Sequence, residues 1–413
     1  MGACSGARVK DASAYGSNVA VEWYDLAYRL TRSEALSPPV AARAFAYMGV
    51  ALYEGVVSGM PNNRSLAGMV NGELVVPPLE RGVEYHWPMV AGSALATVMP
   101  AFYQKETSYL SIQNLFADQK EAALKTTSRD VITRSEDYGR SVGVATLRWA
   151  LGDGYEAIRG CPYEPPLAPG AWVPTPPAMA KALEPCWGRL RPFVMSNVVQ
   201  FRAPPPTTYS EDRSSLFFGE NLEVYLTRNN LDAEQREIAL YWADDPGRTG
   251  TPPGHSVALL TQLVVERQKS LDFAAEAYAR AGMAVADAFI SCWDTKYTYN
   301  LMRPVTYIKN WIDPDWMPLL NTPPFPEYTS GHSVQTAAMA TVLEGMFGDG
   351  PFVDRVHESA GRKARSFDSF KQMMGETAIS RLYAGIHYRP AIDVGVEQGT
   401  QIGKAVMALK LGK

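Results

Sequence analysis

The stretch that decides the fold and the chemistry of this chain consists of Trp293-Asp-Thr-Lys296, Arg303-Pro304, Pro326-Glu-Tyr-Thr-Ser-Gly-His332, Ser380-Arg381 and His387. These segments together hold two arginines, one lysine, two histidines and a Ser-Gly step. A tetrahedral oxyanion is bound by fixed positive charge and by backbone N–H groups directed at its oxygens. We therefore expect an oxyanion site whose binding groups come from this stretch.

The spacing of these residues suggests how they reach one anion. Lys296 and Arg303 are seven residues apart. In one helix they would lie on one face, roughly 10 Å apart along the axis. Ser330-Gly331-His332 precedes an apolar stretch, residues 334–346, that predicts a helix. Ser330 would then be the N-cap, and Gly331 would let the backbone approach an anion at the helix N-terminus.

The last two residues of the pattern need a break in the helix. Arg381 and His387 are six residues apart, so one straight helix would not direct both to the same point. A helix that ends near Gly385 would let both side chains turn toward the same point. Taken singly, each piece has a plainer explanation, since a Lys-x6-Arg pair is ordinarily a solvated helix face and Ser-Gly-His is ordinarily a turn. Their order in a chain with only five histidines favours a common site.

This three-part pattern resembles the signature shared by vanadium-dependent haloperoxidases and PAP2-type acid phosphatases. Trp293, three residues before the lysine, narrows the resemblance to the fungal vanadium chloroperoxidases. Residues 241–253 resemble the segment that supplies the buried aspartate of the haloperoxidases. The detailed resemblance covers residues 235–400, and the chain is far longer than the small bacterial acid phosphatases. We therefore expect a haloperoxidase of bacterial type.

The resemblance implies a role for each residue of the pattern. Vanadate, replaceable by phosphate, would be bound through a ring nitrogen of His387, which must be neutral to act as a metal ligand. His332 would act as acid and base when hydrogen peroxide replaces the axial oxygen, and halide attack would then yield hypohalous acid. The oxygens of the anion would be bound by Lys296, Arg303, Ser330, Gly331 and Arg381, with Lys296 also polarising the peroxide.

Three further residues are expected around this site. Asp245 would pair with Arg381 and fix its guanidinium, with Asp244 as the alternative. Phe325, with Trp293, would form the halide pocket, because its position is Phe in the fungal chloroperoxidases and His in the algal bromoperoxidases. Bromide and iodide are oxidised more easily than chloride, so we expect them to be substrates before chloride. An organic acceptor of the halogen remains open.

The alternative function is a phosphomonoester hydrolase with the same residues. His387 would be the nucleophile and His332 would protonate the leaving group. The phosphatases usually carry Asp four residues after that histidine, whereas this chain has Ala391 there and Asp393 two residues further on. This difference weakens the alternative and leaves the orienting partner of His387 unknown. A pure phosphate- or vanadate-binding protein is disfavoured, since binding alone does not need two imidazoles.

Composition and periodicity predict an all-α fold. The chain of 413 residues is 46% hydrophobic and has a net charge of −4, which gives no indication of nucleic-acid binding. Strand alternation is scarce, and apolar residues recur at helical spacing. Helices are expected over residues 14–36, 39–57, 88–103, 112–127, 131–151, 233–242, 256–267, 271–293 and 391–411. The segment 152–206 is rich in proline and glycine and predicts an ordered covering loop. The resemblance implies two four-helix bundles, which we place at 1–205 and 206–413, the second carrying the anion site.

The cysteines give information on whether the protein is exported from the cell. The start Met1-Gly-Ala-Cys4 resembles the cleavage end of a bacterial lipoprotein signal, which would place a lipid anchor at Cys4. If the protein is exported, Cys161 and Cys186 could pair in the Pro-rich segment. Cys292 lies in an apolar stretch and is expected to be buried. We also consider a homo-oligomer.

Overall fold

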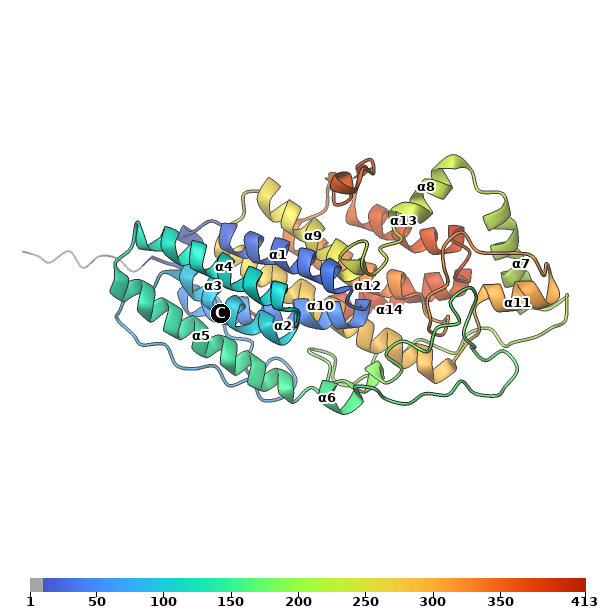
Figure 1. The fold of residues 1–413 in the computed structure, drawn as a ribbon, viewed down its shortest axis with the longest axis horizontal. Helices are drawn as coiled ribbons and strands as arrows, with labels where there is room; N and C mark the ends of the chain where they lie inside the picture. Colours follow the sequence, from blue (N-terminus) through green and yellow to red (C-terminus); the bar gives the residue numbers. More distant parts are fainter. Residues whose placement is uncertain (1–9) are drawn as a thin grey trace, which may run out of the picture.

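The computed structural model describes residues 10–413 and is built almost entirely of α-helices (Figure 1). The helices are α1 (Asn18–Glu34), α2 (Pro38–Val56), α3 (Trp87–Val98), α4 (Glu106–Leu124), α5 (Arg129–Leu151), α6 (Tyr155–Ile158), α7 (Leu216–Asn229), α8 (Ala233–Tyr241), α9 (Thr251–Glu266), α10 (Leu271–Tyr299), α11 (Pro304–Trp311), α12 (Gly331–Phe347), α13 (Phe370–Tyr383) and α14 (Arg389–Met407). The only sheet in this part of the chain is a hairpin of β1 (Phe352–Asp354) and β2 (Arg365–Phe367). The all-α prediction is confirmed.

Two groups of helices share the long helix α10. Helices α1 to α5 form the N-terminal group, and α9, α10, α12, α13 and α14 form the C-terminal group (Figure 1). Helix α10 packs against α2 on one side and against α12 on another. Gly49 and Gly282 allow the first contact, because a Cβ on Gly49 would lie 2.6 Å from the Tyr278 carbonyl oxygen. The backbones of α2 and α10 therefore approach more closely than larger residues would permit.

A second glycine contact positions the anion site. A Cβ on Gly399 of α14 would lie 2.0 Å from the carbonyl oxygen of Val334, in the first turn of α12. Helix α14 therefore lies directly against the N-terminal end of α12, where Ser330 and Gly331 stand. The chain enters α14 at Arg389, two residues after His387, so this packing brings His387 and the α12 N-terminus together.

One hydrophobic core runs through both groups of helices. A single cluster of buried residues includes members from Ala12 to Leu411. A smaller cluster joins α7, α11 and the start of α14. The predicted division at residue 205 therefore does not separate two independent cores, although the boundary itself stays a prediction. Helix α2 with the following turn, residues 38–59, is long and apolar enough to span a membrane, but 89% of the relevant window is buried in the protein.

Most predicted helices occur close to their expected bounds, and the exceptions have local causes. Helix α9 begins at Thr251, five residues before the expected start. Pro252 and Pro253 fit into its first turn, because the N–H groups of a first turn have no partner within the helix and proline has no N–H to leave unpaired. Helix α7 was not predicted by its own pattern. In one helix Lys296 and Arg303 would have shared a face, but α10 ends at Tyr299 and Asn300 adopts a left-handed conformation. Arg303 is the N-cap of α11.

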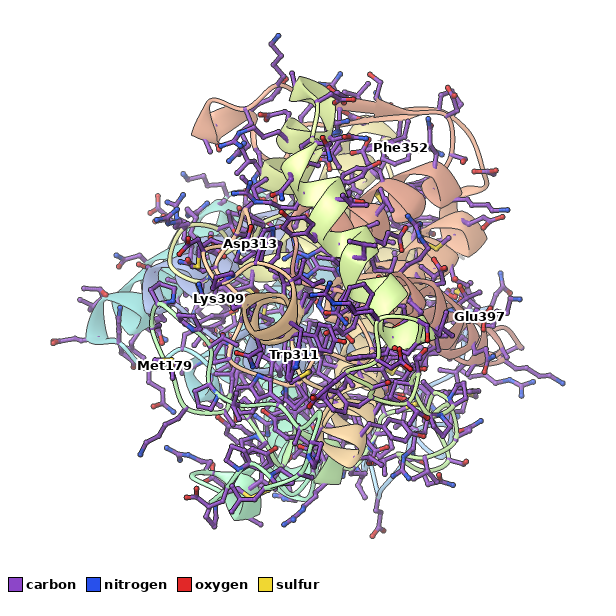
Figure 2. All side chains as sticks on the ribbon, turned by 90° about the vertical axis from the view of Figure 1, so that its right-hand side faces the viewer. Met179, Lys309, Trp311, Asp313, Phe352 and Glu397 are labelled. Carbon is purple, nitrogen blue, oxygen red and sulfur yellow. A yellow bond between two sulfur atoms is a disulfide. The ribbon has the colours of Figure 1, made fainter. Side chains whose placement is uncertain are left out.

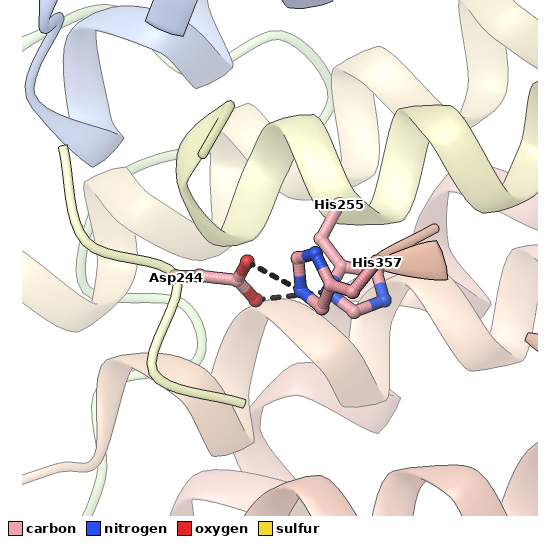
Figure 3. A group of neighbouring side chains, drawn as sticks. All are labelled: Asp244, His255 and His357. Carbon is pink, nitrogen blue, oxygen red and sulfur yellow. Dashed lines mark hydrogen bonds and ion pairs between the residues drawn. The ribbon is translucent and has the colours of Figure 1, made fainter. Parts of the chain in front are cut away.

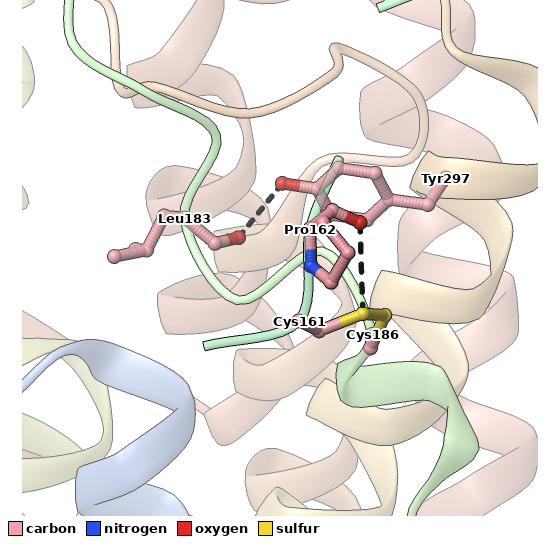
Figure 4. The surroundings of a disulfide bond; sticks show 5 residues. All are labelled: Cys161, Pro162, Leu183, Cys186 and Tyr297. Atoms are coloured by element: carbon pink, nitrogen blue, oxygen red, sulfur yellow. Dashed lines mark hydrogen bonds between the residues drawn. A yellow bond between two sulfur atoms is a disulfide. The ribbon is translucent and has the colours of Figure 1, made fainter. Parts of the chain in front are cut away.

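The Pro-rich segment 152–206 is an ordered cover over the C-terminal ends of α10 and its neighbours. Trp172 and Trp187 within it are almost completely buried. Cys161 and Cys186, whose pairing the sequence left open, form a disulfide, and the nearby Tyr297 hydroxyl of α10 donates a 2.7 Å hydrogen bond to the Leu183 carbonyl (Figure 4). The end view in Figure 2 shows α11 with Lys309 and Trp311 near its centre and Met179 of this segment at the left edge.

Removing the disulfide is expected to destabilise the protein. The bond closes a loop of 25 residues, for which the loss of chain entropy in the unfolded state corresponds to about 3 kcal/mol. The double variant Cys161→Ser/Cys186→Ser should therefore unfold at a lower denaturant concentration than the parent. Chemical denaturation followed by circular dichroism, with and without reductant, measures this. An unchanged midpoint would contradict a stabilising role for the bond.

Candidate active site

A pocket of about 280 Å³ opens where the Pro-rich cover meets the N-terminus of α12. Its wall consists largely of proline and aromatic side chains, contributed by residues 175–177 of the cover, 323–325 of the loop before α12, and α10. Its polar lining includes residues of the sequence pattern, Gly331, His332, Arg381 and His387, together with Asp244 and other polar side chains. Segments far apart in the chain thus meet at one apolar pocket with a polar floor, which is the usual form of a small-molecule site.

His387 is held by a carboxylate that the sequence analysis did not identify. Its Nδ1 lies 2.7 Å from Glu327 Oε1, which also accepts a 2.9 Å hydrogen bond from the Tyr388 backbone N–H. Nδ1 therefore carries a proton and Nε2 keeps its lone pair. Burial, together with Arg303 and other nearby positive charges, holds the pKa of His387 well below its ordinary value. The imidazole is neutral, with Nε2 available as a ligand.

Glu327 is the carboxylate that orients His387, in place of the aspartate that position 391 lacks. It stands in the Pro326-Glu-Tyr-Thr-Ser-Gly-His332 segment, before α12, rather than on the helix that follows His387. Asp393, the nearest carboxylate in sequence, is exposed at the second turn of α14. Burial raises the pKa of Glu327 to about 7, against the opposing effect of Lys296 and Arg303. The only sequence signal for Glu327 was its place inside the motif.

Arg303 contacts His387 from the other side. Its Nε donates to the Phe325 carbonyl at 2.8 Å, and its Nη1 donates to the Ile386 carbonyl at 2.8 Å and faces His387 Nε2 at 3.2 Å. Its Nη2 is buried and has no hydrogen-bond partner. The guanidinium is therefore fixed in orientation by backbone carbonyls, with one N–H group left to bind a further acceptor.

Lys296 is buried at the same point but directed differently from the expectation. Its Nζ donates to the carbonyls of Pro326, at 2.9 Å, and Glu327, at 2.8 Å, and also to that of Thr329. All three donors of the ammonium group are thus used by the loop before α12. Burial lowers the pKa of Lys296 to about 7. To contact an anion, Lys296 must exchange one of these carbonyls for an anion oxygen.

The N-terminus of α12 has the predicted cap. Ser330 is the N-cap, and its Oγ accepts a 3.3 Å hydrogen bond from the Ser333 N–H. Gly331 lines the pocket, and the nearest atom to a Cβ built on it would be 3.6 Å away, on Trp293. The free N–H groups and the dipole of α12 therefore face the pocket, which favours a bound anion.

His332 and Arg381 meet at one backbone carbonyl. Arg381 Nη1 donates to the Trp242 carbonyl at 2.9 Å, and His332 also forms a hydrogen bond with this oxygen. Because His332 Nε2 has no partner, its Nδ1 makes that bond and Nε2 is free toward the pocket. Burial and the charge of Arg381 hold the pKa of His332 well below its ordinary value. Helix α13 ends at Tyr383, before Gly385, as the spacing of Arg381 and His387 required.

The predicted pairing of Asp245 with Arg381 does not form in the structure. Asp245 is exposed, and in the described chain no oxygen of it lies within 4 Å of an Arg381 nitrogen. Asp244 has a left-handed backbone, with φ of 49°, so the two side chains leave the turn in different directions. Asp244 is the buried one. Both carboxylates act on Arg381 from a distance, while burial lowers its pKa to about 10.

Trp293 and Phe325 form one aromatic wall, as expected for a halide pocket. Their ring centroids are 4.9 Å apart. Lys296 Nζ lies 5.0 Å and Arg303 Cζ 4.9 Å from the centre of the Phe325 ring. The Trp293 Nε1 donates to the Leu183 carbonyl at 3.2 Å, so the indole is fixed by the Pro-rich cover. The wall offers no polar donor of its own to a small anion.

The fold and the site together define a helical protein with a buried, cation-rich oxyanion site. Residues 276–411 match the family model of the second helical-bundle domain of vanadium chloroperoxidase. Over 275 residues the chain is 24% identical to the vanadium chloroperoxidase of Curvularia inaequalis, a match that covers 50% of this chain and 45% of that protein. The chain thus spans about half the length of this curated relative.

Solved structures extend the similarity to the whole chain. A bacterial vanadium-dependent iodoperoxidase is 37% identical, with a TM-score of 0.89, over 95% of this chain and 96% of that one. The chain therefore belongs to the vanadium-dependent haloperoxidase family. A bacterial vanadium-dependent chloroperoxidase in its holo form, 14% identical with a TM-score of 0.67 over 91% of this chain and 92% of that one, shares the fold.

The site fits the anion that this family uses. Lys296, Arg303 and Arg381 are buried, and none of them forms an ion pair with a carboxylate of the described residues 10–413. Buried polar atoms without a hydrogen-bond partner are found on the same residues and their neighbours: Arg303 Nη2, Arg381 Nε, His332 Nε2 and Ser333 Oγ. Burying so much unpaired positive charge is costly unless an anion balances it. A vanadate or phosphate ion would supply that charge.

Proposed function

We propose that this protein oxidises halide with hydrogen peroxide to hypohalous acid, with vanadate bound at His387. The observation that carries the proposal is the neutral His387, whose Nε2 lone pair is set by Glu327 and faces buried guanidinium donors. Vanadate, when bound, supplies a Lewis-acidic centre that polarises peroxide for attack by halide. The halide loses two electrons and becomes hypohalous acid, while the peroxide is reduced to water.

The residues of this chain would bind the anion and transfer the proton. Arg303 Nη2, Arg381 and the N–H groups of the α12 N-terminus would bind the anion oxygens, and Lys296 would join them by giving up a loop carbonyl. His332 Nε2 would accept a proton from the incoming peroxide and return it to the leaving oxygen. The low pKa of His332 suits the first of these steps, because the ring is unprotonated in the resting protein.

The activity is tested directly with purified protein loaded with orthovanadate. Hydrogen peroxide and bromide should then brominate a phenol-type reporter, which is measured by absorbance. Phosphate should inhibit by competing for the same site, since its charge and shape match those of vanadate. Phosphatase turnover without any halogenation that depends on peroxide would overturn the proposal.

We further propose that iodide and bromide are preferred to chloride. Support comes from the 37% identical iodoperoxidase and from the lower potential needed to oxidise the heavier halides. Rates measured at equal halide concentrations should fall in the order iodide, bromide, chloride. Chloride turnover equal to that of iodide would contradict this order.

Phosphomonoester hydrolysis is kept as a second candidate because of Glu327. The absence of Asp at position 391 weakened this function, but the Glu327 carboxylate lies 2.7 Å from His387 Nδ1 and could orient a nucleophilic imidazole. Hydrolysis of p-nitrophenyl phosphate by vanadate-free protein tests this, and loss of hydrolysis on adding vanadate would locate it to the same site. No hydrolysis above background would exclude it.

We also propose that the protein is exported. The Cys161–Cys186 disulfide supports this, because such bonds persist in oxidising compartments. The proposed lipid anchor at Cys4 lies outside the described residues. Labelling with a radioactive fatty acid in the producing cell, compared between the full precursor and its Cys4→Ser variant, tests the anchor. An organic acceptor and a homo-oligomer stay proposals without support beyond the apolar pocket wall.

A further inference from the structure

A second cluster of titratable residues lies beside the anion pocket and has no part in the chemistry described above (Figure 3). It consists of Asp244 from the loop between α8 and α9, His255 from α9, and His357 from the segment after β1. All three side chains are at least 95% buried. One ligand atom from each lies within 4.8 Å of the others. Two imidazoles and a carboxylate are the ligand types that zinc prefers in proteins.

His255 is oriented by Asp354 of β1. Its Nε2 lies 2.8 Å from Asp354 Oδ2, while Asp354 Oδ1 accepts a 2.9 Å hydrogen bond from the Val356 N–H. The Nδ1 of His255 lies 2.9 Å from Asp244 Oδ2, so without a metal ion the ring donates from both nitrogens and the two carboxylates raise its pKa to about 10. A metal ion bound between Nδ1 and Asp244 would replace the Nδ1 proton, while Nε2–H would still donate to Asp354. A histidine whose far nitrogen donates to a carboxylate is the usual arrangement around a protein-bound metal ion.

The contact between Asp244 and His357 is the observation that points to a ligand. His357 Nε2 lies 3.1 Å from Asp244 Oδ1. Both atoms are fully buried, and although they are close enough for an ion pair, their geometry is too poor for a well-formed hydrogen bond. Two such unpaired atoms in a water-poor interior are costly, and native proteins rarely leave them so. Something that accepts lone pairs from both atoms would remove that cost.

We propose that Asp244, His255 Nδ1 and His357 Nε2 bind a divalent metal ion of the zinc type. Ligand atoms around zinc are about 2.0–2.2 Å from the ion, so the observed separations of 2.9 and 3.1 Å between carboxylate oxygens and ring nitrogens need only small adjustments. The charges balance, because the ion offsets the carboxylates of Asp244 and Asp354 while both imidazoles stay neutral. A doubly protonated His255 alone would explain its own two contacts but not the unpaired atoms of Asp244 and His357.

The proposed ion would join three segments next to the anion pocket. Asp244 also lines that pocket, together with His332 and Arg381, so an ion bound to Asp244 would fix one wall of it. Access from solvent is short, because residues 245–248 and 358–361 on either side of the cluster are exposed. The ion is separate from vanadate, which would be held at His387. The proposal therefore does not depend on the proposed enzymatic activity.

Metal analysis of the whole protein tests the site. Protein treated with EDTA, incubated with excess zinc and desalted in buffer free of vanadate should retain about one zinc per chain, by mass spectrometry. His357→Gln should reduce the zinc content at least tenfold while its circular dichroism stays that of the parent. His387→Ala, which removes an imidazole of the anion site instead, should retain the zinc and serves as the matched control.

Two results would overturn the proposal. One is a zinc content in the parent protein below one tenth per chain. The other is undiminished zinc in His357→Gln. If this variant does not fold, anomalous diffraction at the zinc edge from crystals of the parent protein decides the matter without any substitution. A peak between Asp244, His255 and His357 supports the site, and a peak elsewhere or no peak overturns it.

Discussion

Replacing His387 by alanine is expected to abolish peroxide-dependent halide oxidation and to weaken vanadate binding by more than the roughly 10–100-fold that follows loss of a residue outside the ligand shell. The reason is that His387 Nε2 is the one neutral ring nitrogen in the site whose lone pair is fixed by a carboxylate on the opposite nitrogen, among the described residues. Calorimetric titration of the vanadate-free variant with orthovanadate measures the binding, and the reporter assay measures turnover.

His332→Ala is the matched control for this prediction. His332 also lines the pocket and also has a lowered pKa, but its Nε2 has no partner and its expected work is proton transfer. The variant should therefore keep most of its affinity for vanadate and lose turnover. If His387→Ala bound vanadate as tightly as the parent, or if His332→Ala lost binding to the same extent, the two histidines would have other roles.

The sequence predicted the helical fold because its signals are local. Apolar spacing marked α1 to α5, and the Ser330 cap and the break near Gly385 depend only on neighbouring residues. Lys296 and Arg303 do not share the single helix that their spacing would allow, and the reason is tertiary. Asn300 takes a left-handed conformation and the Trp172 N–H donates to its carbonyl, so α10 ends there and a new helix begins. Lys296 is therefore positioned by the last turn of α10, and Arg303 by the N-terminus of α11.

The errors within the site concern which way a side chain points. Asp244 and Asp245 are chemically identical neighbours, and only the backbone of the turn decides that Asp244 is buried. Glu327 was missed because its partner is 60 residues away in sequence, and a helix register from His387 pointed instead to positions 391 and 393. The assignment of Lys296 to the anion stays a prediction, and the structure adds that three nearby carbonyls bind its ammonium group. No pattern in the sequence shows how a lysine shares its donors.

Replacing Glu327 is expected to have the second-largest effect. The carboxylate accepts the Nδ1–H of His387 and so keeps Nε2 unprotonated and more basic. Glu327→Ala leaves both Nδ1–H and the Tyr388 N–H without a partner, and vanadate affinity should fall about 10–100-fold. Glu327→Gln should lose less, because the amide oxygen can still accept from Nδ1. Calorimetric titration with orthovanadate gives the order, and ¹⁵N NMR of the His387 ring reports which nitrogen carries the proton.

Asp393→Asn is the control that separates orientation of His387 from a general change in charge. It removes one negative charge near the start of α14, but Asp393 is exposed and forms no hydrogen bond to His387. Its vanadate affinity should equal that of the parent. A graded loss from Glu327 to Gln to Ala, with the ring proton shifting away from Nδ1, is what a positioning carboxylate requires. Equal affinity in all three proteins, or a loss in Asp393→Asn as large as in Glu327→Ala, would show that Glu327 does not set the state of His387.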